Sequence, residues 1–128
     1  MNLLLDTHIW LWSQLEPEKL GARVQRELQQ PGNERWLSPI SVWEAAVLHR
    51  KGKLTISGNV TEWFERSLTG LFEATLTYEI ALVAEQISLH SDPADRFLAA
   101  SAKVLNLTLV TADKRLLGLG DIATLANR

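Results

Sequence analysis

Short apolar runs alternate with longer amphipathic segments along this chain. The runs 3–5, 36–38, 72–76 and 107–110, with a further short one near Ile122, predict strands. Between them, apolar residues recur about every three to four positions, which predicts helices over 9–12, 17–30, 41–51, 60–68, 78–89, 92–105 and 114–117. Strands that alternate with helices favour a central parallel sheet covered by helices on both faces. The predicted fold class is therefore α/β, a three-layer α/β/α sandwich.

Proline and glycine mark several element boundaries. Pro17 suits the first turn of helix 17–30, and Pro39 closes strand 36–38. Gly52 suits the residue after a helix C-terminus. No internal repeat or linker interrupts the pattern, so the 128 residues predict a single domain over 1–128.

Composition narrows the functional classes. The chain has no cysteine, which excludes disulfides and thiolate metal sites and suits a reducing cytosol, so a cytoplasmic location is expected. Asp6 ends the first apolar run and no basic segment precedes it, which argues against a signal peptide. No apolar run is long enough to span a membrane. The net charge of −2 argues against a passive nucleic-acid binder, but not against an enzyme that acts on nucleic acid.

Four acidic residues follow a predicted strand or open a predicted helix: Asp6, Glu44, Asp95 and Asp113. The carboxyl ends of parallel strands and the helices after them meet at one edge of a sheet, where ligands bind. Four carboxylates at that edge would repel each other unless a cation lay among them. Oxygen ligands of this kind suit Mg²⁺ or Mn²⁺. The sequence therefore predicts a divalent-metal site.

Local structural roles compete with this interpretation for the first two acids. Asp6 is a good helix N-cap, although Thr7 could take that position and leave Asp6 to face the crevice. Ser41 and Glu44 match the capping box, in which the glutamate reaches back to the cap amide. Both interpretations of Glu44 keep it close to a helix N-terminus.

The other two acids also have local alternatives. Asp92 precedes Pro93 and is the expected N-cap, which places Asp95 at the third helical position, where it interacts favourably with the helix dipole. Arg96 could hold Asp95 in place or meet a phosphate. Asp113 could form a turn or cap the helix 114–117. Thr111 could supply a hydroxyl to the same site.

Other polar and aromatic positions are weaker candidates. His8 could be a ligand or a proton donor, although a packed or surface histidine is the more common role. His49 and His90 lie near predicted helix ends, and the basic run 49–53 suits a helix C-terminus. Trp10 and Trp12 are two residues apart on a helix and cannot share a face, so one of them could meet a partner.

Taken together, these segments resemble those of PIN-domain proteins, and most of all the VapC-type toxins of bacterial toxin–antitoxin pairs. The resemblance covers essentially the whole chain, with the motifs in the family's order. Four strings carry it: Leu-Leu-Leu-Asp6-Thr-His-Ile-Trp-Leu-Trp, Ser41-Val-Trp-Glu44-Ala, Asp92-Pro-Ala-Asp95-Arg-Phe-Leu-Ala-Ala and Leu-Val-Thr111-Ala-Asp113-Lys-Arg-Leu.

The resemblance implies a Mg²⁺- or Mn²⁺-dependent endoribonuclease, usually a homodimer, that a small cognate antitoxin inhibits by occupying its groove. It implies that Asp6, Glu44, Asp95 and Asp113 form the acidic quartet, which holds the metal so that water can be activated against an RNA phosphodiester. Thr111 falls on an accessory hydroxyl position. Ala94 stands where the family often has an aromatic residue. The alternative is a non-catalytic module of the same fold that binds protein or RNA, with the acids serving only as caps.

Overall fold

The computed structural model of the chain describes residues 1–89 and 92–128. Within these residues five strands form one parallel sheet in the order β3-β2-β1-β4-β5. The strands are β1 (Asn2–Leu5), β2 (Glu34–Leu37), β3 (Phe72–Glu73), β4 (Thr108–Thr111) and β5 (Thr124–Ala126).

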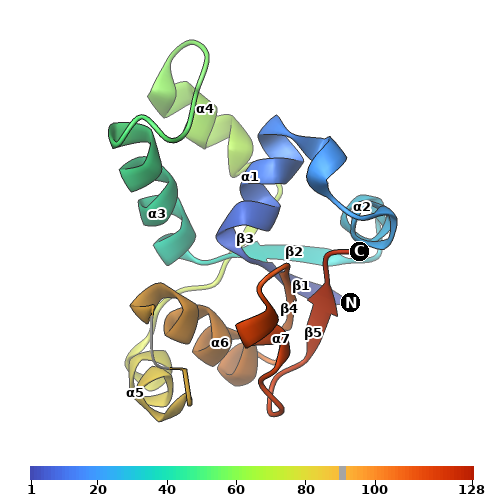
Figure 1. Cartoon of the computed structure of the whole chain (residues 1–128), viewed down its shortest axis with the longest axis vertical. Coiled ribbons are helices and arrows are strands. Elements are labelled where there is room, and N and C mark those ends of the chain that lie inside the picture. The colour runs from blue at the N-terminus through green and yellow to red at the C-terminus, as the bar shows by residue number, and fades with distance from the viewer. Residues whose placement is uncertain (90–91) are drawn as a thin grey trace.

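Helices cover both faces of this sheet, which confirms the predicted α/β/α sandwich (Figure 1). One layer contains α1 (Thr7–Leu15), α2 (Ala22–Gln29), α3 (Pro39–Arg50) and α4 (Val60–Ser67). The other contains α5 (Tyr78–Gln86), α6 (Pro93–Leu105) and α7 (Lys114–Leu117). Among the described helices none is both long and apolar enough to cross a bilayer.

Two hydrophobic cores lie on opposite faces of the sheet, because successive side chains of a strand point to opposite sides. On β1, Leu3 and Leu5 join the core with Trp10 and Val24, whereas Leu4 joins the core with Leu98. All of these side chains are buried. The apolar run of β1 is therefore uninterrupted because both of its faces are covered, as is usual in parallel sheets.

The order of the strands creates a crevice beside the middle strand. The chain passes from β1 to β2 and β3 on one side, and then returns to β4 and β5 on the other. The carboxyl ends of β1 and β4 therefore lie side by side at the point where the connections diverge, which is where ligands bind in open α/β sheets. The Asp6 amide donates to the Val110 carbonyl at 3.0 Å and extends this pairing by one residue.

Several predicted element boundaries were wrong. The expected helix 17–30 is a 3₁₀ turn, η1 (Pro17–Lys19), followed by α2, with Gly21 as the N-cap between them. The third strand spans only Phe72–Glu73, α5 ends at Gln86, and the last strand is Thr124–Ala126 rather than a strand near residue 122. His90 lies outside the described residues.

Gly21 is required by the approach of a distant part of the chain. A Cβ atom at this position would lie 1.7 Å from the carbonyl carbon of Arg128. The Gly21 amide also donates to Asn127 Oδ1 at 2.7 Å. Residues after β5 therefore explain why the residue between η1 and α2 is a glycine, and no local pattern could reveal this contact.

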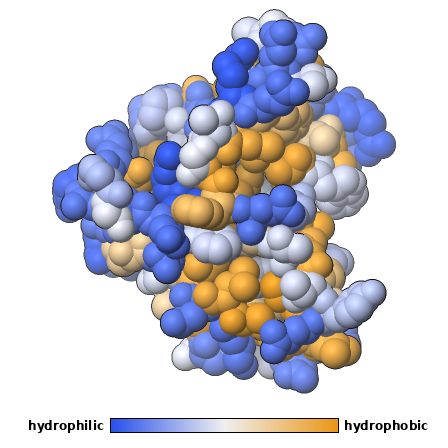
Figure 2. Space-filling view, turned by 180° about the vertical axis from the view of Figure 1, so that it is seen from behind, coloured by the Kyte–Doolittle hydropathy of each residue, from blue (hydrophilic) through white to orange (hydrophobic). Residues whose placement is uncertain are grey.

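Apolar side chains also reach the surface. Figure 2, the face opposite to that of Figure 1, shows apolar residues gathered in its upper and lower parts with a hydrophilic band between them. The most exposed large apolar or aromatic residues of the described chain are Met1, Trp43, Phe72, Tyr78 and Leu82. Single exposed apolar side chains are common on protein surfaces, whereas contiguous apolar patches mark surfaces that contact other proteins.

Candidate active site

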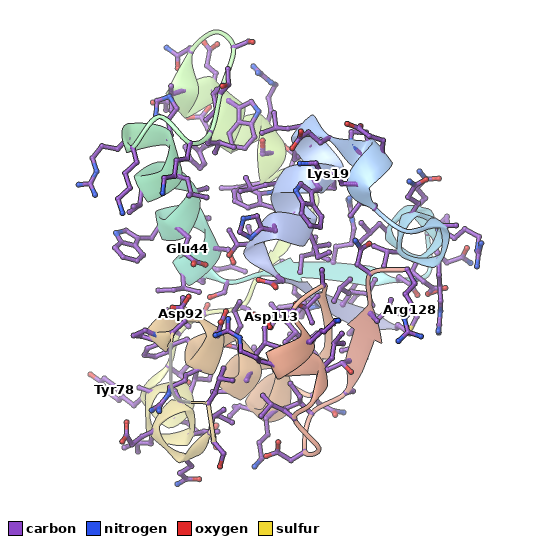
Figure 3. All side chains as sticks on the ribbon, viewed as in Figure 1. Lys19, Glu44, Tyr78, Asp92, Asp113 and Arg128 are labelled. Carbon is purple, nitrogen blue, oxygen red and sulfur yellow. The ribbon has the colours of Figure 1, made fainter. Side chains whose placement is uncertain are left out.

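The four acids singled out from the sequence line one cavity of about 460 Å³. They come from four segments: the end of β1, helix α3, the first turn of α6 and the start of α7. In Figure 3, Glu44 lies on one side of this cavity, while Asp92 and Asp113 lie on the other. The sheet order explains the convergence, because the cavity lies at the carboxyl ends of β1 and β4.

Asp6 caps a helix and faces the cavity at the same time. Its Oδ1 accepts a hydrogen bond from the Thr7 amide at 2.7 Å, so it is the N-cap of α1. Its Oδ2 accepts from the Thr111 hydroxyl at 2.6 Å. Thr111 is fully buried at the end of β4. The suggestion that Thr7 takes the cap was wrong, and the two roles of Asp6 proved compatible because each uses a different oxygen.

Glu44 is held from across the cavity by α1. Its Oε1 accepts a hydrogen bond from the Thr7 hydroxyl at 2.6 Å, and the same hydroxyl lies 2.8 Å from Ser41 Oγ. The capping-box interpretation was wrong, because α3 begins at Pro39 with Ser38 as its N-cap. Pro39 therefore starts a helix, which suits a residue that lacks an amide proton. Glu44 consequently lies in the second turn, beyond reach of the cap.

Asp95 and Asp113 share one guanidinium group. Arg115 Nη2 lies 3.3 Å from Asp95 Oδ2 and 2.9 Å from Asp113 Oδ2. Asp113 is the N-cap of α7 and also accepts from the Arg115 amide at 2.8 Å. Asp92, as predicted, caps α6 by accepting from the Ala94 amide, which leaves Asp95 buried in the first turn.

Burial and mutual repulsion perturb these carboxyl groups unequally. Burial is the main cause that raises the pKa of Asp6 and of Glu44, against the lowering effect of their threonine donors. Burial, followed by repulsion from Asp92, Asp6 and Asp113, raises the pKa of Asp95 to about 7. The hydrogen bond from Arg115 lowers the pKa of Asp113. Ionisation of Asp6, Glu44 and Asp95 therefore costs free energy, and a nearby positive charge would offset that cost.

The chemistry of the donor set fits a hard divalent cation. All four acids offer carboxylate oxygens, and sulfur is absent from the cavity lining. Among the described residues, no three Asp, Glu or His side chains are gathered closely enough to ligate one ion as they are placed. The Arg115 guanidinium provides positive charge between two of them instead. Binding of a cation would therefore require the acids to draw together.

Comparison with known proteins identifies the family. The family model for the PIN domain matches residues 3–121, nearly the whole chain. The chain belongs to the PIN domain family. This confirms the predicted resemblance, and it places the four acids within the matched part of this PIN domain.

Proteins similar to this PIN domain include a VapC ribonuclease and, in fold, VapBC complexes. The chain is 28% identical over 117 residues to the ribonuclease VapC22 of Mycobacterium tuberculosis, covering 90% of this chain and 89% of that protein. Its fold is similar to that in the complex VapBC2 of Rickettsia felis bound to promoter DNA, with a TM-score of 0.74, 19% identity and 98% of each chain covered. DNA-bound VapBC of Salmonella typhimurium gives a TM-score of 0.75 at 16% identity, covering 100% of this chain and 99% of that one.

The arginine expected beside Asp95 points elsewhere. Arg96 donates from Nε to the Leu89 carbonyl, and its Nη1 lies 3.7 Å from Glu85 on α5. The expectation that Arg96 holds Asp95 was therefore wrong, because successive residues of a helix point about 100° apart. Arg115 contacts Asp95 instead.

Sequence reasoning missed two charged members of the cavity lining, Arg115 and Asp92, and assigned Thr7 no specific partner. Asp92 had been interpreted only as a cap, although a cap three residues before Asp95 lies in the same helical turn. Arg115 follows Asp113 by two residues, a spacing at which a side chain can fold back over its own N-cap. The Thr7 contact with Glu44 had no local signal, because it joins α1 to α3.

Proposed function

We propose that this PIN domain is an endoribonuclease that depends on Mg²⁺ or Mn²⁺ and acts as the toxin of a toxin–antitoxin pair. The observation that carries the proposal is the convergence of four carboxylates, from four separate segments, on one cavity at the carboxyl ends of parallel strands. The ribonuclease name of the relative VapC22 supports RNA as the substrate. The proposal treats residues 1–128 as one nuclease domain in the cytoplasm.

The residues of the cavity have distinct roles in this proposal. Asp6, Glu44, Asp95 and Asp113 would hold the metal, which when bound supplies a Lewis acid that lowers the pKa of water and offsets charge on a phosphate. Thr111 fixes the orientation of the Asp6 carboxylate through its 2.6 Å hydrogen bond. Thr7 does the same for Glu44 across the cavity.

Arg115 contributes positive charge at the exposed edge of the same cavity. Its side chain is half exposed, whereas that of Asp95 is 13% exposed. A guanidinium group placed there can bind a phosphate oxygen of an approaching RNA chain. The acids attract a cation but repel the phosphates of RNA. The positive charge of Arg115 at the edge of the cavity would attract this anionic substrate.

A protein partner forms the second part of the proposal. Solved relatives include VapBC complexes from Rickettsia felis and Salmonella typhimurium. The apolar surface of this chain (Figure 2) is available for contact with a small antitoxin and with a second copy in a homodimer. The antitoxin would inhibit the enzyme by covering the groove that leads to the acids.

The decisive experiment is cleavage of end-labelled total RNA by the purified protein with Mg²⁺ or Mn²⁺, beside an EDTA control and the variant Asp6→Asn. We expect discrete products that disappear in both controls. RNA that is bound but left intact, with binding insensitive to EDTA, would favour the alternative of a non-catalytic RNA-binding module. A complete lack of cleavage and of metal binding would overturn the enzymatic proposal.

A further inference from the structure

Two aromatic side chains extend the acidic cavity along helix α1. His8 and Trp12 are one helical turn apart, and their rings lie 5.9 Å apart between centroids at an angle of 54°. Both residues line the same cavity as the four acids. His8 is exposed and Trp12 is partly exposed. We refer to His8 and Trp12 together as the aromatic shelf.

Trp10 and Trp12, two residues apart on α1, have different surroundings. Trp10 is fully buried, lies against Trp63 and Phe64, and donates from its indole nitrogen to the Ser67 carbonyl at 3.2 Å. Trp12, two residues further on the same helix, packs only partly against that core. Its remaining surface lines the cavity. The Trp12 side chain is therefore held against the core by one part of its surface while another part faces the cavity.

A cation lies close to the shelf. Lys19 Nζ from η1 is 5.8 Å from the centroid of the Trp12 ring, within the range of a cation–π contact. The same nitrogen is 3.1 Å from Glu16 Oε2, and both side chains are about half exposed. An aromatic side chain with a half-exposed cation beside it is the combination that proteins use to bind single-stranded nucleic acid, with bases stacked on rings and phosphates near cations.

We propose that the aromatic shelf binds an unpaired nucleobase of the RNA, next to the phosphate that enters the acidic cavity. The inference rests on the proposed ribonuclease function and adds a base-binding subsite to it. Stacking on Trp12 would hold the nucleotide at a fixed distance from Asp6, which begins the same helix. Because every base has a π-face, the subsite would require an unstacked base without selecting one sequence.

The test compares two fluorescein-labelled hexanucleotides of random sequence, one with all of its bases and one in which abasic sugars replace them. Affinity for each oligomer is measured by fluorescence anisotropy with Ca²⁺ in place of Mg²⁺ or Mn²⁺. The oligomer is checked afterwards to verify that it was not cleaved during the measurement. We expect the wild type to prefer the oligomer with bases by about tenfold. Trp12→Ala should lose most of this preference, and Trp12→Phe should keep most of it.

The matched control is Trp43→Ala, because Trp43 is 61% exposed on α3 and is not among the residues that line the cavity. This control should behave as the wild type, and melting temperatures should verify that all variants fold. An equal preference in wild type and Trp12→Ala would overturn the subsite, as would a wild type that ignores the bases. Cleavage of total RNA by the wild type would still support the nuclease in either case, so the two failures are distinguishable.

Discussion

The two halves of the acidic cavity differ in the groups that contact their carboxylates. In the hydroxyl half, Asp6 and Glu44 each accept a hydrogen bond of 2.6 Å from a threonine hydroxyl. In the guanidinium half, Asp95 and Asp113 share the side chain of Arg115. One half therefore receives neutral donors and the other receives a full positive charge.

The difference shows what each kind of partner can achieve. Threonine donors orient the carboxylates, but the pKa of both Asp6 and Glu44 remains raised because burial outweighs the hydrogen bonds. The guanidinium lowers the pKa of the more exposed Asp113, yet the pKa of the buried Asp95 still rises to about 7. The positive charge of Arg115 therefore does not offset burial and repulsion at Asp95.

The largest effect is expected from removal of one carboxylate in either half. Asp6→Asn and Asp95→Asn should each reduce RNA cleavage by about a hundredfold or more, because the metal would lose a charged ligand. The matched control is Asp121→Asn, which makes the same chemical change at an exposed acid that pairs with Lys103. Cleavage assays with Mn²⁺ measure the loss, and full activity in both cavity variants would contradict the assigned ligands.

The second prediction concerns the guanidinium half alone. Arg115→Gln should bind Mn²⁺ about tenfold more tightly, because the ion would no longer compete with a resident positive charge for two carboxylates. Lys114→Gln removes the same charge from the neighbouring residue and should change the affinity far less. Calorimetric titration measures both variants. Weaker binding by Arg115→Gln would mean that the arginine positions the acids for the metal rather than competing with it.

Sequence reasoning succeeded where a feature depends on neighbours in the chain. The start of α6 follows from Asp92 and Pro93 alone, because an N-cap and a first-turn proline are local signals. Placing the four acids at one edge required only the alternation of strands and helices. The parallel sheet then brought them into one cavity.

Prediction failed where contacts join distant segments or where one local rule overrides another. Ser41 and Glu44 match a capping box, but the helix starts earlier, with Ser38 as its N-cap and Pro39 as its first residue. Ser41 is therefore not the N-cap, and the pattern does not apply. The contacts of Arg115 with Asp95 and of Thr7 with Glu44 each link separate helices. Hydrophobic periodicity fixes the face of a helix that is buried, but not which polar groups meet across a cavity.

The third prediction separates orientation from charge in the hydroxyl half. Thr111→Val keeps nearly the same shape in a fully buried position but removes the donor to Asp6. We expect cleavage to fall about fivefold to tenfold, as for loss of one hydrogen bond of roughly 1–1.5 kcal/mol. Thr111→Ser is the control that restores the hydroxyl and should recover most of the activity. Initial rates at saturating Mn²⁺ test this, and equal rates for the valine and serine variants would contradict it.

The smallest effect is the dependence of metal stabilisation on pH. The folded pKa of Asp95 is about 7, above the unfolded value of 3.8, so its contribution to stability is fully present below about pH 4 and is lost as the pH rises through 7. The pKa of Asp113 is lowered in the folded protein, so its contribution to stability is present above the unfolded value of 3.8. That contribution is lost as the pH falls through the folded pKa. Mn²⁺ binds the ionised form, so it should raise the melting temperature by a few degrees at pH 8 and by less at pH 5.

Asp95→Asn is the variant that isolates this pH effect, because an amide cannot ionise. Without metal, its melting temperature should fall less than that of the wild type between pH 5 and pH 8. Differential scanning fluorimetry in EDTA and in Mn²⁺ gives both quantities from one set of samples. If the melting temperatures of the wild type and of Asp95→Asn change equally with pH, the Arg115 guanidinium already neutralises Asp95 fully. In that case the guanidinium half would need no further cation, and the metal would have to be held by Asp6 and Glu44.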